Sequence, residues 1–174
     1  MPAQITILGT CHDVQGLDKW KGRKIGEKDY QEILLGRLQD KDFLFEEATG
    51  LGPSIAERLA EKKLGIGHYF DIDPPLLRRS AHGIPNETGN CFPLDPFDDY
   101  TEFLCESFVE THEKREDLWV RYVQDQSFEN ALLVCGQMHL LSMAFRLRSA
   151  GYQVTAFLYM PWQQFCKRPH VEQK

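Results

Sequence analysis

Short apolar runs alternate with longer amphipathic stretches along most of the chain. The apolar runs are rich in β-branched and aromatic residues, which predicts buried strands. The stretches between them repeat apolar residues at helical spacing, which predicts helices packed on a sheet. We expect strands at Gln4–Gly9, Asp42–Ala48, Gly67–Ile72, Asn130–Cys135 and Tyr152–Tyr159, and helices at Lys28–Gln39, Gly52–Leu64, Phe103–Gln126 and Leu140–Ala150.

This alternation predicts an α/β fold with a mostly parallel five-stranded sheet and helices on both faces. The 174 residues suit a single domain. Crossovers between parallel strands are right-handed, and the commonest winding gives the strand order 3-2-1-4-5. The stretch from 80 to 100 is rich in Gly, Pro, Asn and Asp and too long for an ordinary connection, so we expect a functional loop or lid there.

Charge and composition narrow the classes of partner. The formal net charge is −6, and Lys and Arg are scattered, so nucleic acid is not an expected partner. The start of the chain has no signal-peptide pattern, and no apolar run is long enough for a membrane helix. The five cysteines form no C-x-x-C pair and are expected to be reduced thiols. A cytoplasmic protein with a small-molecule or peptide substrate is the resulting expectation.

Two Gly-x-x-His motifs follow the first and fourth predicted strands, Gly9 to His12 and Gly136 to His139. In the expected order these strands are neighbours at the point where the winding reverses. Ligands of open α/β sheets bind there, beside the carboxyl ends of the strands. Strands lie about 4.8 Å apart, so we expect His12 and His139 to converge on one small volume.

Acidic residues end the next strands of the predicted sheet. Glu46 and Glu47 end the second strand, and the alternative for one of them is to face solvent or to pair with a basic neighbour. Asp71 and Asp73 end the third strand and precede a Pro-Pro turn, where Asp is common for backbone hydrogen bonding alone. His, Glu and His suit a first-row divalent metal such as Mn²⁺, Co²⁺ or Zn²⁺, which would activate a water molecule.

These motifs resemble the TraB/Tiki and erythromycin-esterase/ChaN-like superfamily. The matching segments are ILGTCH (7–12), FLFEE (43–47), KREDLW (114–119) and VCGQMHLLSM (134–143). The resemblance implies an α/β fold and, in several branches, ester hydrolysis or metal-dependent peptide cleavage, while other branches bind a ligand such as haem. Carried over by position, it points to His12, Glu46, Arg115 and His139 as site residues, with Glu46 preferred to Glu47 because it directly follows the apolar run.

The leading hypothesis is a hydrolase in which His12, Glu46 and His139 bind a metal or act as acid, base and orienting group. Arg115 would steady a charged part of the substrate, although its position within a charged helix also suits a solvated ion pair. The alternatives are a non-catalytic protein that binds a small ligand or cofactor in the same crevice, and an interaction protein that acts through the long loop. Cys11 and Cys135 are expected to be small buried residues, and His112 to be solvated.

Overall fold

A five-stranded, wholly parallel sheet forms the centre of the computed structural model, and the predicted α/β class is confirmed. The structure describes residues 2–10, 27–48, 53–74, 76–84 and 106–159. His12, Cys11 and most of the predicted long loop lie outside these residues. The strands are β1 (Gln4–Thr10), β2 (Phe43–Glu46), β3 (Tyr69–Asp71), β4 (Asn130–Gly136) and β5 (Gln153–Leu158). The helices are α2 (Glu27–Arg37), α3 (Ile55–Lys63), α4 (Leu76–Arg79), α5 (Glu106–Gln124) and α6 (Leu140–Ser149), with the short 3₁₀ turns η1 (Ser80–His82) and η4 (Gln137–His139).

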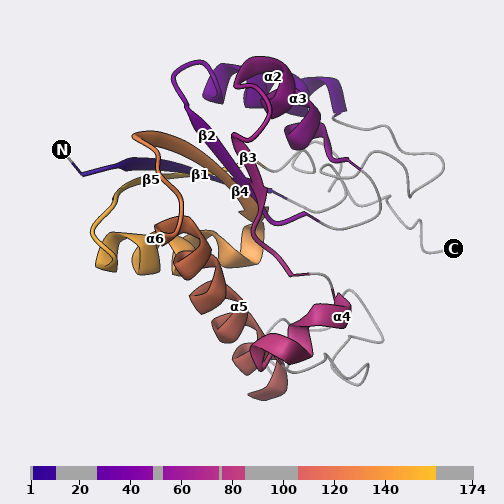
Figure 1. Cartoon of the computed structure of the whole chain (residues 1–174), viewed down its shortest axis with the longest axis vertical. Helices are drawn as coiled ribbons and strands as arrows, with labels where there is room; N and C mark the ends of the chain where they lie inside the picture. The colour runs from indigo at the N-terminus through magenta and orange to yellow at the C-terminus, as the bar shows by residue number, and fades with distance from the viewer. Residues whose placement is uncertain (1, 11–26, 49–52, 75, 85–105, 160–174) are drawn as a thin grey trace, which may run out of the picture.

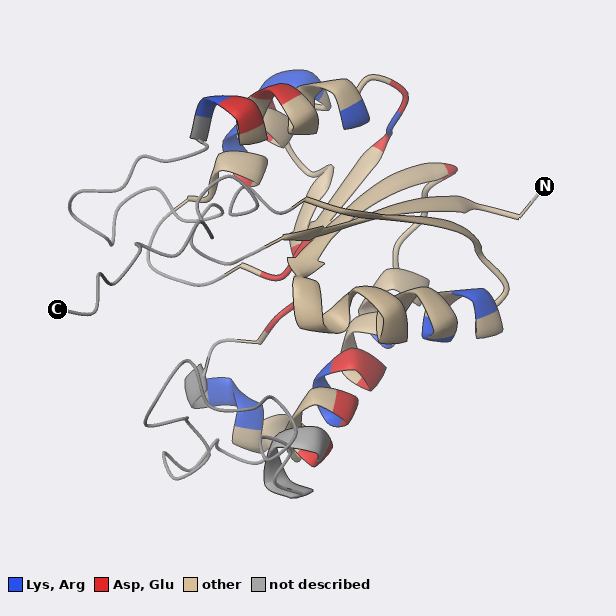
Figure 2. Cartoon of the chain, turned by 180° about the vertical axis from the view of Figure 1, so that it is seen from behind, with Lys and Arg blue, Asp and Glu red and all other residues tan. Residues whose placement is uncertain are grey.

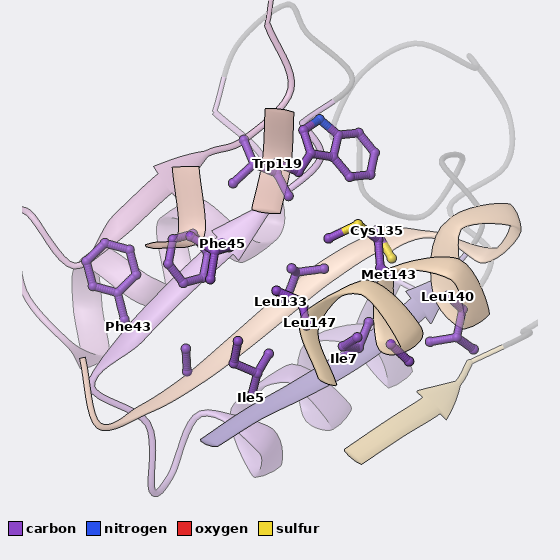
Figure 3. Close-up of a cluster of buried hydrophobic side chains, with 14 residues drawn as sticks. Ile5, Ile7, Phe43, Phe45, Trp119, Leu133, Cys135, Leu140, Met143 and Leu147 are labelled. Carbon is purple, nitrogen blue, oxygen red and sulfur yellow. The ribbon is translucent and has the colours of Figure 1, made fainter. Parts of the chain in front are cut away.

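The helices cover the sheet in two layers, α2 and α3 on one face and α5 and α6 on the other (Figure 1). The α5/α6 face is closed by a hydrophobic core that includes Ile7, Phe45 and the fully buried Trp119 (Figure 3). The α2/α3 face is closed by a second core around Leu44 and Tyr30. Side chains of successive strand residues enter the two cores alternately, as the pleat requires.

The strand order is 3-2-4-1-5, so the predicted order 3-2-1-4-5 is wrong in the placement of strands one and four. β4 lies between β2 and β1, whereas we had expected β1 in that position. Both strands are apolar and buried on both faces, so the hydrophobic pattern fits either one at the centre. The adjacency of β1 and β4, on which the pairing of the two Gly-x-x-His motifs depends, is confirmed.

This order places the reversal of winding between β2 and β4. The chain leaves β2 through α3 toward β3 at one edge, and leaves β4 through α6 toward β5 at the other edge. The two connections run over opposite faces of the sheet (Figure 1). The carboxyl ends of β2 and β4 therefore lie at the edge of the sheet where ligands of open α/β sheets bind.

Gly9 of the first motif packs closely against the start of α6. A Cβ at this position would lie 3.0 Å from the Cβ of Leu140. The glycine is thus explained by close approach between β1 and the segment that carries His139. Of the described helices, none is both long and apolar enough to cross a membrane.

Candidate active site

A buried polar network begins where β2 ends beside β4. The Glu47 N–H donates to the carbonyl of Val134, which extends the pairing of the two strands by one residue. The Glu47 side chain is 2% exposed, and its Oε2 accepts the backbone N–H of Gly136 at 2.7 Å. Its Oε1 accepts Nη2 of Arg115 at 2.5 Å. Glu47 therefore ties β2, the second Gly-x-x-His motif and α5 together.

Arg115 lies between two buried carboxylates. Its Nε and Nη2 donate to Asp73 at 3.0 and 3.1 Å, in addition to the bond to Glu47. Asp73 also accepts Nη2 of Arg79 at 2.9 Å and the indole N–H of Trp119 at 3.3 Å. Burial alone would lower the pKa of Arg115, but the two carboxylates raise it above its ordinary value, so the guanidinium stays charged.

His139 is held by a carboxylate on α5. Its Nδ1 lies 2.7 Å from Oε1 of Glu116, which also accepts the hydroxyl of Ser142 at 2.6 Å. Oε2 of Glu116 accepts Nε of Arg146 at 3.0 Å. Burial would raise the pKa of Glu116, but hydrogen bonds from His139 and Ser142 lower it below its ordinary value. An ionised carboxylate only accepts, so Nδ1 of His139 carries the proton of this bond.

The other ring nitrogen of His139 is directed toward the end of β2. Nε2 lies 3.7 Å from Oε1 of Glu47, which is too far for a hydrogen bond. The His139 side chain is nevertheless 2% exposed. The imidazole thus has one nitrogen fixed by Glu116 and a second nitrogen beside Glu47 and Arg115, at the carboxyl edge of the sheet.

Glu46 takes a different environment from its neighbour Glu47. It lies on the α2/α3 face, where its Oε2 accepts the hydroxyl of Ser54, the N-cap of α3, and that of Tyr69 at 3.0 Å. Oε1 is buried and has no hydrogen-bond partner among the described residues. Burial raises the pKa of Glu46 to about 8, against the opposing effect of these two hydrogen bonds, and nearby Asp71 raises it further.

The structure brings Arg115 and His139 together through Glu47, and it does not bring Glu46 to them. Residues that follow one another in an extended strand point to opposite faces of the sheet. Glu46 accordingly joins the α2/α3 core, whereas Glu47 reaches the α5/α6 side. His12 lies outside the described residues.

Sequence reasoning assigned no site role to Glu116, and it placed His112 in solvent. The second expectation is wrong, because His112 is half-buried and packs on the His139 ring. Helical spacing could have identified both Glu116 and His112. Together with Arg115 and Trp119 they are at positions i, i+3, i+4 and i+7 of one helix, so all four share a face. Figure 2 shows the mixed acidic and basic segments along α5.

The network pairs carboxylates with guanidinium groups. Glu47, Asp73 and Glu116 face Arg79, Arg115 and Arg146, and Arg146 also pairs with Asp117. Among the residues that the structure describes, no three His, Cys, Asp or Glu side chains are grouped so as to hold a metal ion. Glu46 and His139 lie on opposite faces, so they do not fit a shared ion.

Nearby, Cys135 is buried as expected, and burial raises the pKa of its thiol.

Comparisons with family models, with curated proteins and with solved structures find no match for this chain.

Proposed function

We propose that the protein is a hydrolase that cleaves an ester or amide-type bond, with His139 as the acid–base group. The observation that carries this proposal is the pair of Glu116 and His139. Glu116 accepts the Nδ1 proton, which leaves Nε2 as the nitrogen that exchanges a proton with water or substrate. A carboxylate that holds a histidine in one tautomer is a recurring part of acid–base sites.

In this proposal His139 takes a proton from the attacking water and later returns it to the leaving group. Glu116 stabilises the imidazolium formed in between, because it is an ionised carboxylate 2.7 Å from Nδ1. Arg115 holds the Glu47 side chain in place beside His139. The resemblance to the TraB/Tiki and erythromycin-esterase/ChaN-like superfamily supports the same class of reaction, and it is the source of the assignment of Arg115.

The proposal includes a divalent metal, Mn²⁺, Co²⁺ or Zn²⁺, whose effect on hydrolysis is to be tested. His12 and His139 were predicted as its ligands together with Glu46. The carboxylate on the His139 side of the sheet is Glu47, and it is already paired with Arg115 and with the N–H of Gly136. A metal bound by His139 and Glu47 would compete with these two contacts of Glu47, so we derive no catalytic step from it.

The second candidate is a protein that binds a small ligand beside His139 without cleaving it. The observation in its favour is that Arg115 directs its hydrogen bonds to Glu47 and Asp73. Arg115 is therefore not available to hold a charged group of a substrate unless the site rearranges, and this counts against catalysis.

The test is a panel of chromogenic esters and peptide amides assayed with the wild-type protein, His139→Gln and the control Glu113→Gln. Glu113 is exposed on the same helix. The proposal predicts hydrolysis by the wild type and by the control, and a loss of roughly 100-fold or more in His139→Gln. Each assay is repeated with the three metals and with a chelator. Equal rates in wild type and His139→Gln would refute the role of His139.

A further inference from the structure

The His139 ring contacts two aromatic rings of α5. One is His112, whose ring centroid is 4.4 Å from that of His139 with an interplanar angle of 32°. The other contact is Trp119, edge-on, with a centroid distance of 4.7 Å and an angle of 64°. Both residues come from the same helix face as Glu116. The imidazole of His139 thus has two ring contacts with α5 besides its hydrogen bond to Glu116.

A hydrogen bond at Nδ1 does not by itself fix the plane of an imidazole. The ring can still tilt about the axis that joins the bonded nitrogen to the side-chain stem, since torsions of this type are broad. Aromatic contacts restrict that tilt. The rings of His112 and Trp119 therefore supply a restraint that Glu116 cannot supply alone.

The half-buried position of His112 suits it to a contact with another imidazole. Burial lowers the pKa of His112 to about 4, and the positive charge of Arg115 acts in the same direction. The ring is neutral across the neutral pH range. It therefore packs against His139 without adding positive charge beside Arg115.

We propose that His112 is a positioning residue whose ring, packed against His139, fixes the plane of the His139 imidazole and screens its Glu116 hydrogen bond from water. This role rests on the function proposed above, because His112 would act by orienting the two ring nitrogens of His139. It also makes a physical claim about His139 that is measurable without any substrate.

The test compares the wild type with His112→Phe and His112→Ala. Phenylalanine keeps an aromatic face against His139 but cannot hydrogen-bond or take up a proton, whereas alanine removes the ring. The readout is the Nδ1–H of His139 in ¹H–¹⁵N NMR spectra, identified by its absence from His139→Gln. Its nitrogen shift reports the tautomer, and its exchange with water reports the exposure of the bond to Glu116.

We expect wild type and His112→Phe to give similar slow exchange, and His112→Ala to exchange roughly two- to tenfold faster, the factor expected for losing one aromatic contact. Circular dichroism checks that the variants fold, and His112→Leu replaces the alanine variant if that does not fold. Unchanged exchange in the variant without the aromatic ring would overturn the proposal, and so would fast exchange in His112→Phe. A failed substrate assay with intact slow exchange would refute the hydrolase function and leave the positioning role standing.

Discussion

Replacing Glu46 with glutamine should stabilise the protein at neutral pH. Burial raises the pKa of the Glu46 carboxyl to about 8 from an ordinary value of 4.5. The folded state therefore keeps a proton that the unfolded chain loses between these two values. A group with a raised acid pKa makes the folded state less stable as pH rises through that window. Glutamine keeps the shape of the protonated acid and does not titrate.

The magnitude follows from the width of the window. One proton of difference changes the free energy of unfolding by about 1.4 kcal/mol per pH unit. Between pH 5 and pH 7.5 this group alone should lower the stability of the wild type by about 3 kcal/mol relative to Glu46→Gln. The carbonyl oxygen of the amide still accepts the hydroxyls of Ser54 and Tyr69, so the two proteins should be nearly equal in stability at pH 5.

The assay is urea unfolding followed by circular dichroism at half-unit steps from pH 5 to pH 8.5. The difference between wild type and variant isolates Glu46 from other titrating groups, such as Asp71, whose pKa burial raises to about 6. Glu61→Gln is the matched control, because Glu61 is exposed on α3, and it should follow the wild type at every pH. Parallel curves for wild type and Glu46→Gln would refute the reasoning, since they would show that Glu46 is ionised in the folded protein.

Three further changes have expected outcomes in the same unfolding assay. Gly9→Ala should lower stability by about 1–3 kcal/mol, because the added Cβ would meet Leu140 at 3.0 Å; no loss would mean that this contact relaxes freely. Arg115→Met should cost about 3–5 kcal/mol, since it leaves buried Glu47 without its cation and Asp73 with Arg79 alone, and a loss below 1 kcal/mol would contradict the network. Phe145→Ser should change stability by less than about 0.5 kcal/mol, because this side chain is 72% exposed; a large loss would show that it is covered.

The sequence was sufficient for the fold class because strand and helix patterns are local. It was insufficient for the positions of β1 and β4, because both strands are apolar on both faces and the commonest winding was assumed. The cap of α3 was readable from Ser54 followed three residues later by Glu57, which form a capping box in the structure.

The site was predicted in part for similar reasons. His139 followed from its place after a buried strand, and its proximity to Arg115 followed from the family resemblance. The choice of Glu46 over Glu47 was made from sequence position alone, which does not say which of two successive side chains faces α5. Glu116 and His112 were missed because charged helix residues usually face solvent, and their partner is distant in sequence.

The most direct test of the central claim is a double-mutant cycle on kcat/KM with His139→Gln, Glu116→Gln and the two combined, using the best substrate found in the panel. Glu116 is proposed to act through His139, so its loss should have no further effect once the imidazole is gone. The account predicts that the double variant is as slow as His139→Gln alone. Full additivity of the two single effects, or a Glu116→Gln variant as fast as the wild type, would contradict it.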